Sequence, residues 1–395
     1  MYKPRFLTRN IFSGVGNLNV FSQNISNEVH PLKIEKALIV SKLSRYESEK
    51  RIYSNCSEHE LEKILRKRGT NYEKLVSFHE LHRNFENNLT ETLNRFGTEV
   101  EVVNRYNLTE EKVDDADIII PIGGDGTYLL ASSRVRNNKK PVIGFNSDPS
   151  RSEGCLCLPS WCSLDIKKSL EKLQRGQFKW LMRNRIRTTI ENNEGDMLNP
   201  KCLHDIKGYS LPTFQTGEKN VLPVLALNEV FMGETLSARV SHLQLRLNGS
   251  QDKTDLKCSG ICVCTGTGST SWHLSINRLS TQCIAELLRL IDLDSSEEKD
   301  GLAKSLSDLY NRNLMFAPED KRMGYTIRDL ISSGVWPNPK GIKPRGFATG
   351  VEVQSHCFEA MLVVDGGVSF PFNDGAIAKL EIRPEDALRT VVFKE

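Results

Sequence analysis

The stretch DADIIIPIGGDGTYLLASSRV, residues 115–135, constrains this chain most, because a run of aliphatic residues stops there at three closely spaced glycines. The apolar run 118–122 is typical of a buried strand, and helix-like spacing resumes after the last glycine. Glycines directly after a strand let the backbone pass close to a ligand, and free amides at a helix start favour anionic oxygen. Gly123, Gly124 and Gly126 are therefore predicted to form an anion-binding loop.

The segments around this loop alternate between strand and helix patterns. Strands are predicted at 36–41, 98–103, 117–122 and 141–146. The helix predicted over 71–96 carries an apolar stripe made of Leu75, Phe78, Phe85, Leu89, Leu93 and Phe96. This order predicts a mostly parallel sheet with helical crossovers, and ligands collect at the carboxyl edge of such sheets. The glycine loop is expected at that edge.

The pattern changes after about residue 164 to period-two alternation, as in ARVSHLQLRLNG at 238–249. We therefore expect an α/β domain over 31–164 and a β-rich domain over 165–395 whose C-terminal end can return to the first domain. Helical and loop sequence is expected to interrupt the second domain from Thr281 to about Gly346.

Composition excludes several classes of partner. The net charge of only +3 gives no electrostatic case for a nucleic acid. No stretch approaches the roughly 18 to 20 apolar residues of a membrane span, so no membrane partner is expected. The ten cysteines lack a paired C-x-x-C arrangement, which predicts free thiols in a reducing compartment, and no residue is assigned as a metal ligand.

The first 27 residues contain Lys3, Arg5 and Arg9 and no acidic residue before Glu28. They also lack the continuous apolar core of a secretory signal. This composition predicts a mitochondrial transit peptide over residues 1–30, and a disordered N-terminus is the alternative.

The aspartate inside the glycine loop indicates chemistry rather than simple phosphate binding. The loop is neither a Walker sequence nor a G-x-G-x-x-G fingerprint. A carboxylate beside phosphates is repelled unless a metal ion or an acceptor hydroxyl stands between them. Asp125 therefore suggests proton abstraction or metal-linked positioning during phosphoryl transfer, and a plain Gly-Asp-Gly turn is the alternative.

Three motifs occur in a fixed order: GGDGT at 123–127, Asn-Glu at 228–229 and TGTGSTSW at 265–272. With them the chain resembles the NAD kinase family. The resemblance is closest to the mitochondrial NAD kinase 2 branch of animals, through PVIGFNSDPSRSEGCLCLP, ALNEVFMGE, CTGTGSTSW and FNDGAIA. It extends from about residue 36 to the C-terminus.

The resemblance implies a Rossmann-like N-terminal α/β domain, a C-terminal β-sandwich-like domain and a nucleotide site between them. It implies transfer of the γ-phosphate of ATP to the 2′-hydroxyl of the adenosine ribose of NAD, giving NADP, with Asp125 as the base. A divalent cation, Mg²⁺ or another, is expected to neutralise the phosphates. A homodimer in the mitochondrial matrix is also implied. The nucleotide-binding residues are expected to be Gly123, Gly124, Gly126, Thr127, Asn228, Glu229, Thr265, Gly268, Ser269, Thr270, Ser271 and Trp272.

The motifs also have local alternatives. Asn228 and Glu229 can form a strand-edge turn, and TGTGSTSW can form a hairpin whose Trp272 lies in the core. Family members more usually carry Ala and Tyr at 271 and 272, and many carry Asp where this chain has Ser259, so no acidic contact is assigned there.

Three further residues lie in or near motifs of the family. Arg151, in DPSRSEG after a predicted strand, is a possible phosphate or ribose contact, or else a surface arginine of a solvated turn. Asp365 aligns with an acidic turn of the family, although VVDGG by itself predicts a β-turn. His273 is expected to be a core or surface histidine, because no nucleophile motif accompanies it.

Two other functions compete with an NAD kinase. Diacylglycerol and sphingosine kinases share a similar glycine-aspartate-glycine loop and two-domain plan, so a lipid kinase is the first alternative. A non-catalytic NAD(H)-binding sensor is the second. Asn228, Glu229 and the TGTGSTSW stretch favour the dinucleotide over a lipid, and the intact Asp125 argues for catalysis.

Overall fold

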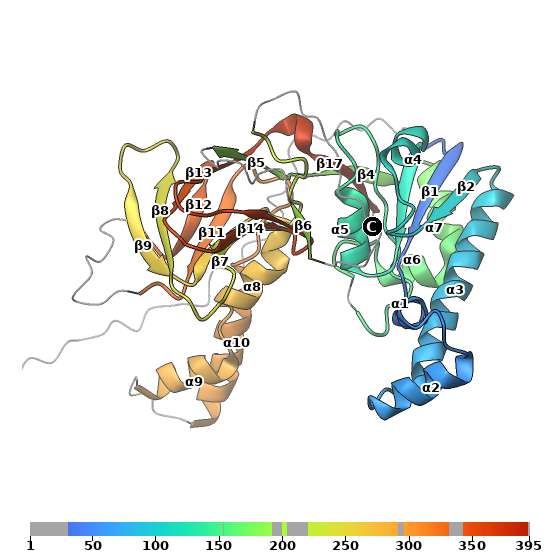
Figure 1. The fold of residues 1–395 in the computed structure, drawn as a ribbon, viewed down its shortest axis with the longest axis horizontal. Helices are drawn as coiled ribbons and strands as arrows, with labels where there is room; N and C mark the ends of the chain where they lie inside the picture. The colour runs from blue at the N-terminus through green and yellow to red at the C-terminus, as the bar shows by residue number, and fades with distance from the viewer. Residues whose placement is uncertain are drawn as a thin grey trace, which may run out of the picture.

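The computed structural model describes residues 31–152, 154–191, 200–203, 220–290, 296–331 and 343–393. The predicted transit peptide over 1–30 lies outside these residues. Figure 1 shows two lobes, an α/β domain that carries β1 to β3 and a domain of antiparallel sheets. No helix in the described ranges is long and apolar enough to cross a membrane.

The first domain is built on a parallel sheet of order β2-β1-β3. Its strands are β1 (Lys36–Ser41), β2 (Glu99–Val103) and β3 (Ile118–Ile122). The strand expected at 141–146 forms only isolated parallel bridges to β3, at Val142 and Phe145. The ladder is interrupted because Pro121 of β3 has no amide hydrogen to donate to the carbonyl of Ile143.

Helices cover this sheet. The helix expected over 71–96 is α3 (Tyr72–Arg95), and the side chain of Asn71 caps it by accepting from the amide of Lys74. Leu89 and Leu93 of its apolar stripe are buried in the same core as β1 and β3. The other helices are α1 (Arg45–Ile52), α2 (Glu58–Lys67), α4 (Glu110–Asp115), α5 (Asp125–Ser132), α6 (Ser160–Leu164) and α7 (Ile166–Gln174).

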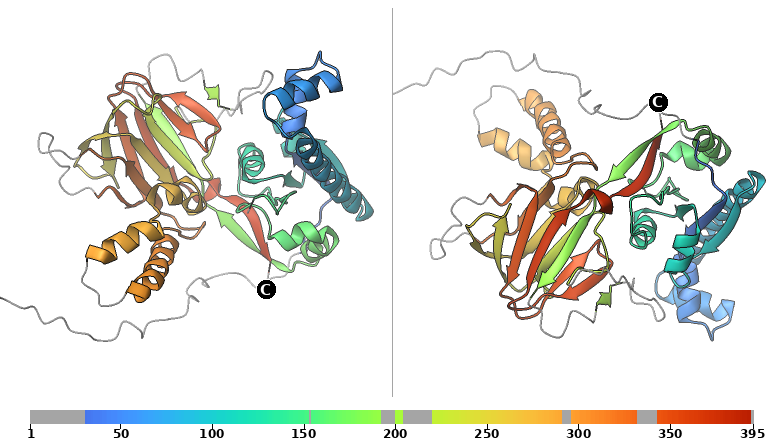
Figure 2. Two further views of the ribbon diagram at one scale, coloured as in Figure 1. Left: turned by 90° about the horizontal axis from the view of Figure 1, so that it is seen from below. Right: turned by 90° about the horizontal axis from the view of Figure 1, so that it is seen from above.

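Segments beyond residue 164 also belong to the first domain. Strand β4 (Phe178–Arg183) pairs antiparallel with β17 (Leu388–Phe393) at the C-terminus, and the two form an arm between the domains (Figure 2). The side chains of Phe178 and Val391 are buried with Ile39 of β1, and so is the apolar face of α7. The second domain therefore begins at β5, about 20 residues after the boundary expected from sequence, because α7 and β4 pack on the first sheet.

The second domain is a sandwich of two antiparallel sheets. Their orders are β12-β11-β10-β7-β14-β15-β6 and β5-β16-β13-β8-β9. The inner faces share one apolar core, in which Val230 and Met232 of the first sheet lie with Leu243 and Leu245 of the second. The strands are β5 (Ile186–Glu191), β6 (Lys201–Cys202), β7 (Glu229–Glu234), β8 (Ser241–Leu247), β9 (Thr254–Cys258), β10 (Gly260–Cys264), β11 (Met323–Arg328), β12 (Arg345–Ala348), β13 (Gly350–Ser355), β14 (Ala360–Val364), β15 (Val368–Pro371) and β16 (Ile377–Ile382).

The region from 281 to 346 contains a strand that the sequence did not predict. Helices α9 (Thr281–Leu290) and α10 (Ser296–Arg312) form the expected helical part, and they extend from the sandwich below α8 (Trp272–Asn277) in Figure 1. Strand β11 then lies between β10 and β12 in the larger sheet. The first five of its six residues, MGYTIR, are buried, so both faces of the strand are covered and no alternation of apolar and polar residues marks it.

A buried arginine ties α5 to the second domain. Nη1 of Arg185 donates to the carbonyls of Ser132 and Val135 at 3.2 and 2.7 Å, and its Nε donates to the carbonyl of Asp386 at 2.5 Å. The guanidinium thus binds carbonyls at the C-terminal end of the helix that follows the glycine loop. This contact holds the loop and the sandwich in a fixed relation.

Candidate active site between the domains

The glycine loop is shaped by close packing between two of its own residues. Gly123 has φ +152°, and a Cβ atom there would lie 2.6 Å from Oγ1 of Thr127. Gly124 is the N-cap of α5 and supplies no side-chain cap. The amide of Thr127 donates to the carbonyl of Gly124 at 3.0 Å, and no side chain caps the amides of Asp125 and Gly126 at the start of α5.

Asp125 uses both oxygens of its carboxylate to hold a second loop. Oδ1 accepts from the amide of Leu156 at 2.9 Å, and Oδ2 accepts from the amide of Cys155 at 3.2 Å. These bonds explain the aspartate in part as a structural residue of the turn. A carboxylate has about four acceptor sites, so each oxygen keeps one lone pair for a hydroxyl.

Asn228 and Glu229 lie at the start of β7, and the turn between β14 and β15 fixes their backbone. The Asp365 carboxylate accepts from the amides of Leu227, Asn228 and Glu229 at 2.8, 2.8 and 3.0 Å. Oδ1 of Asn228 and Oε2 of Glu229 are buried without a hydrogen-bond partner in the described structure. Buried polar atoms are nearly always paired, so these two atoms are available to a ligand or to a bound water.

The two neighbouring carboxyl groups are hard to ionise together. Burial raises the pKa of Glu229 to about 8, and the negative charge of Asp365 adds to this effect. Burial also raises the pKa of Asp365 to about 6, although its three amide donors oppose the shift. At neutral pH Glu229 therefore carries a proton in most molecules, which lets it donate as well as accept hydrogen bonds.

The TGTGSTSW segment holds the backbone around Asn228 in place through hydrogen bonds and close packing. Thr265 donates through its hydroxyl to the carbonyl of Leu227 at 2.5 Å, and its amide donates to the carbonyl of Asn228 at 2.9 Å. A Cβ atom on Gly268 would lie 2.0 Å from the carbonyl oxygen of Asn228, so only glycine fits. The Ser269 hydroxyl is bonded to the carbonyl of Gly266 at 2.6 Å. These residues position the pair through contacts within the protein.

The last residues of the segment turn outward. Thr270 is exposed, Ser271 is half-buried and Trp272 packs its ring 4.8 Å from that of Phe231 on β7. The indole lies on the face of β7 that also carries Glu229, two residues before Phe231. The next residue, His273, is buried, and burial lowers the pKa of its imidazole to about 4.

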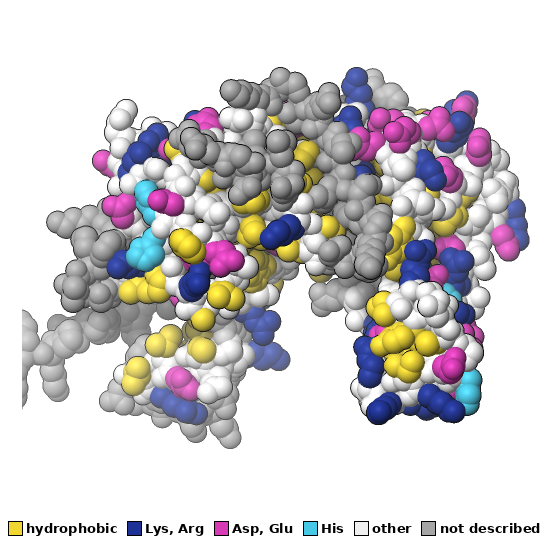
Figure 3. Space-filling model, in the orientation of Figure 1, with side chains coloured by type: hydrophobic (Ala, Val, Ile, Leu, Met, Phe, Trp, Pro, Cys, Tyr) yellow, Lys and Arg dark blue, Asp and Glu magenta, His cyan; other side chains and the backbone are white. Residues whose placement is uncertain are grey.

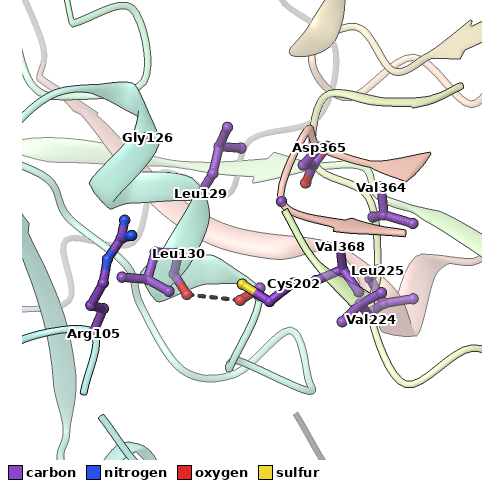
Figure 4. Close-up of a pocket in the computed structure, with 12 residues that line it drawn as sticks. Arg105, Gly126, Leu129, Leu130, Cys202, Val224, Leu225, Val364, Asp365 and Val368 are labelled. Atoms are coloured by element: carbon purple, nitrogen blue, oxygen red, sulfur yellow. Dashed lines mark hydrogen bonds between the residues drawn. The ribbon is translucent and has the colours of Figure 1, made fainter. Parts of the chain in front are cut away.

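A cleft between the domains joins the glycine loop to the second domain (Figure 4). Gly126 and Leu129 of α5 line one wall, and Asp365 lines the other. Arg105, after β2, also lines the cleft and forms no ion pair in the described ranges. Sequence reasoning missed Arg105, because no local pattern relates it to a loop about 20 residues later.

Arg151 does not line this cleft. Its guanidinium carbon lies 3.7 Å from the ring centroid of Phe78, and its side chain lines a separate pocket at the end of β1 and the starts of α1 and α3. Of the residues that the sequence analysis assigned to the site, Gly126 lines the cleft and Arg151 lines this second pocket.

The described residues contain no group of three or more His, Cys, Asp or Glu side chains arranged to hold a metal ion. Mg²⁺ is often bound by one or two carboxylates together with substrate phosphates. The open lone pairs of Asp125 beside the glycine loop fit this second mode.

The chain thus has a two-domain architecture, in which the glycine loop of a Rossmann-like domain faces an antiparallel sandwich across a cleft. The family model described as ATP-NAD kinase N-terminal domain matches residues 29–148. The chain is 37% identical over 387 residues to NAD kinase 2, mitochondrial, of Homo sapiens, covering 91% of this chain and 84% of that protein. The chain therefore belongs to the NAD kinase family.

Two further comparisons agree. The chain is 37% identical over 407 residues to NAD kinase 2, mitochondrial, of Xenopus tropicalis, covering 94% of this chain and 93% of that protein. The solved structure of yeast NADH kinase complexed with NADH superposes with a TM-score of 0.52 at 14% identity, covering 92% of this chain and 84% of that chain. This second likeness concerns the fold.

Proposed function

We propose that the protein is an NAD kinase that transfers the γ-phosphate of ATP to the 2′-hydroxyl of the adenosine ribose of NAD. The observation that carries the proposal is the Asn228–Glu229 pair. Its unpaired buried atoms lie beside Asp365, which faces the glycine loop across the cleft. Family membership supports the same reaction.

On the acceptor side, Asn228 and Glu229 bind the dinucleotide. An amide offers both a donor and an acceptor, and a protonated carboxyl group does the same, which suits ribose hydroxyls and the carboxamide. The Arg105 guanidinium in the cleft provides charge for the diphosphate of NAD. Trp272 supplies an aromatic surface on the same face of β7.

Asp125 acts on the attacking hydroxyl. Held by the amides of Cys155 and Leu156, its carboxylate accepts the hydrogen bond of the ribose 2′-hydroxyl and takes its proton. The 2′-oxygen then bonds to the γ-phosphorus while the bond between that phosphorus and the β–γ bridging oxygen breaks, giving NADP and ADP. The amides at the start of α5 bind the phosphate oxygens during this transfer.

Mg²⁺ or another divalent cation, bound by the donor phosphates and Asp125, would neutralise phosphate charge. Removing divalent cations with a chelator is expected to abolish NADP formation, and adding Mg²⁺ should restore it. Activity that survives chelation would contradict this part of the proposal.

We place the enzyme in mitochondria, and specifically in the matrix, because its animal relatives are named as mitochondrial and residues 1–30 have the composition of a transit peptide. Residues 1–30 fused to a reporter should direct it to the matrix. A cytosolic reporter would argue against this address. We also propose a homodimer, which light scattering after size-exclusion chromatography tests.

The decisive experiment offers the purified protein ATP with NAD, NADH, diacylglycerol or sphingosine in parallel. NADP or NADPH formation is expected, without phosphorylation of either lipid. Lipid phosphorylation would favour the lipid kinase alternative. Tight NAD binding without ATP turnover would identify a sensor.

A further inference from the structure

Arg185, directly before β5, is a fully buried cation. The Lys and Arg side chains that Figure 3 shows lie on the surface of the two lobes, where water and salt screen their charges. A buried charge is screened much less, so the charge of Arg185 acts on groups beyond those that it contacts. The groups within its reach therefore determine its role.

The contacts of Arg185 leave its charge without a bonded carboxylate. Its Nε and Nη1 donate to the carbonyls of Ser132, Val135 and Asp386. Its Nη2 has no hydrogen-bond partner in the described residues. The Asp386 carboxylate acts on Arg185 by its charge, but Nε and Nη2 of Arg187 bind its two oxygens at 2.7 and 2.6 Å. Carbonyl groups and a shared carboxylate therefore balance the charge of Arg185 only in part.

The Asp365 carboxylate is in the opposite situation. It accepts from three backbone amides and forms no ion pair in the described part of the chain. Burial raises its pKa to about 6, and the three amides and the charge of Arg185 oppose this rise. Burial also lowers the pKa of Arg185 to about 10, and the charges of Asp386 and Asp365 oppose that shift. Arg185 and Asp365 thus stabilise each other's charge, although no salt bridge joins them in the described structure.

Glu229 and Asp365 hold one proton between them at neutral pH. Burial raises the pKa of Glu229 to about 8, and the negative charge of Asp365 adds to this effect. The proton is therefore on Glu229 as long as Asp365 is ionised. Protonation of Asp365 would weaken its bonds to the amides of residues 227–229, because an ionised carboxylate is the stronger acceptor. The ionisation of Asp365 thus affects both the backbone and the side chain of Glu229.

We propose that Arg185 is a positioning residue whose buried charge keeps Asp365 ionised and thereby leaves the proton of the pair on Glu229. Ionised Asp365 then holds residues 227–229 in place, and protonated Glu229 donates a hydrogen bond to the dinucleotide. The same guanidinium binds the C-terminal end of α5, so it joins the two walls of the cleft. This role rests on the proposed function only through the binding of the dinucleotide by Glu229.

Other charged or titratable groups also lie near these three residues: Arg105 in the cleft, Tyr128 of α5, Arg187 beside Asp386, and Cys262 and Cys264 of β10. Burial raises the pKa of the phenol and of both thiols, which are therefore neutral at physiological pH. Arg187 and Asp386 neutralise each other. Arg105 is half-buried, so solvent screens its charge more than that of Arg185. Arg185 is the cation whose charge lowers the pKa of Asp365.

Calorimetric titration of the full-length protein with NAD, repeated from about pH 5.5 to about pH 8, tests this role across the pKa values of the two carboxyl groups. Arg185→Met removes the charge, and Arg185→Lys keeps it. Asp365→Asn replaces the titrating carboxyl group with an amide that does not ionise. The matched control is Arg246→Met, because Arg246 of β8 pairs with Glu352 at 3.3 Å and does not line the cleft.

We expect the NAD affinity of the wild type to fall as the pH drops through about 6, where Asp365 takes up a proton. Removing a nearby positive charge raises the pKa of a carboxyl group, so in Arg185→Met this acidic limb should move up by about one pH unit. The Kd for NAD should then be roughly tenfold above that of the wild type at about pH 5.5 and close to it at about pH 7.5.

The other variants separate the charge of Arg185 from its hydrogen bonds. Arg185→Lys should retain the acidic limb of the wild type, and Arg246→Met should match the wild type throughout. In the Asp365→Asn background the acidic limb should be absent, with or without Arg185→Met. A Kd that rises in Arg185→Met by the same factor at every pH would show that the guanidinium acts only through its hydrogen bonds, and would overturn the inference.

Infrared spectra of protein with isotopically labelled Glu provide a second test, which does not depend on the folding of Arg185→Met. At neutral pH the wild type should show the carbonyl stretch of a protonated Glu carboxyl group, and Glu229→Gln should lack it. Equal spectra for the two proteins would contradict the position of the proton. If NAD does not bind the wild type at any pH, the proposed function fails, and the infrared spectra still decide where the proton lies.

Discussion

The amide of Glu229 donates to the Asp365 carboxylate at 3.0 Å, and the amide of Asp365 donates to the carbonyl of Glu229 at the same distance. This reciprocal pair joins the start of β7 to the turn between β14 and β15. Asp365 adopts φ +48°, a conformation that Asp and Asn tolerate better than most residues. The turn thereby sets the backbone position of Asn228 and Glu229, the two residues that we propose bind the dinucleotide.

Asp365→Ala should destabilise the protein, because the amides of Leu227, Asn228 and Glu229 lose their acceptor. We expect the free energy of unfolding to fall by roughly 2–4 kcal/mol, from unsatisfied amides that each cost about 1–3 kcal/mol. Urea denaturation measures the change. Asp365→Asn keeps one oxygen and the tolerance for positive φ, so it should cost less. Equal stability of the Ala variant and the wild type would contradict the structural role.

Glu229→Gln and Asn228→Ala should weaken NAD binding more than ATP binding. Each lost hydrogen bond should cost on the order of 1 to 3 kcal/mol, which raises the KM for NAD. Steady-state kinetics with each substrate varied in turn provide the measurement. Glu91→Gln, an exposed residue of α3, is the matched control. A similar loss for both substrates would favour a general structural effect.

Stability should depend on the ionisation of Glu229. Its pKa is raised from 4.5 to about 8 in the folded protein. Between pH 4.5 and about 8 the folded protein therefore keeps a proton on Glu229 that the unfolded chain has released. The ligand-free protein should therefore lose stability as the pH rises from about 5 to 8. Glu229→Gln removes this contribution and should be more stable than the wild type at pH 8, by a margin that shrinks toward pH 5. Parallel denaturation curves at these pH values test this, and a constant margin would count against it.

Asp125→Asn should lower turnover by about 10² to 10⁴, the usual range for loss of a positioned general base. Oδ1 can still accept from Leu156, so the fold and NAD binding should survive. If the carboxylate is the base, the acidic limb of the pH profile disappears in the variant, whereas a positioning role leaves the profile similar in shape. Asp114→Asn, exposed on α4, controls for charge. Near-normal NADP formation by the folded Asp125→Asn protein would return Asp125 to the role of a turn residue.

Gly268→Ala should abolish NAD binding or folding, because the added Cβ would lie 2.0 Å from the carbonyl oxygen of Asn228. The three nearest atoms all belong to the backbone of Asn228, so no flexible side chain can move aside. Gly301→Ala in α10 meets no atom within 4 Å and should stabilise the protein by about 0.5–1 kcal/mol. Calorimetric NAD titration and thermal melts compare the two, and normal NAD binding by Gly268→Ala would show that this contact can relax.

Local sequence was sufficient for the parts of the protein that depend on neighbouring residues. The aliphatic strand before Gly123, the stripe of α3 and the turn-forming glycines follow from period and backbone freedom. The ordered motifs also identified the family, since each motif is a short contiguous segment. The site residues that the sequence named, such as Asp125 and Glu229, lie within those segments.

Contacts between distant residues were decided only by the tertiary structure. Asp365 binds the amide of Glu229 across 136 positions, and no local pattern distinguishes this aspartate from that of an ordinary β-turn. Periodicity describes which face of an element is apolar but not which surface that face meets. The sequence therefore did not show that β17 pairs with β4 beside the first domain, or that Arg151 stacks on Phe78 in the pocket that Lys42 lines. The sequence thus determined the loop, the motifs and the family, whereas packing over long sequence separations determined how the two sides of the site are built.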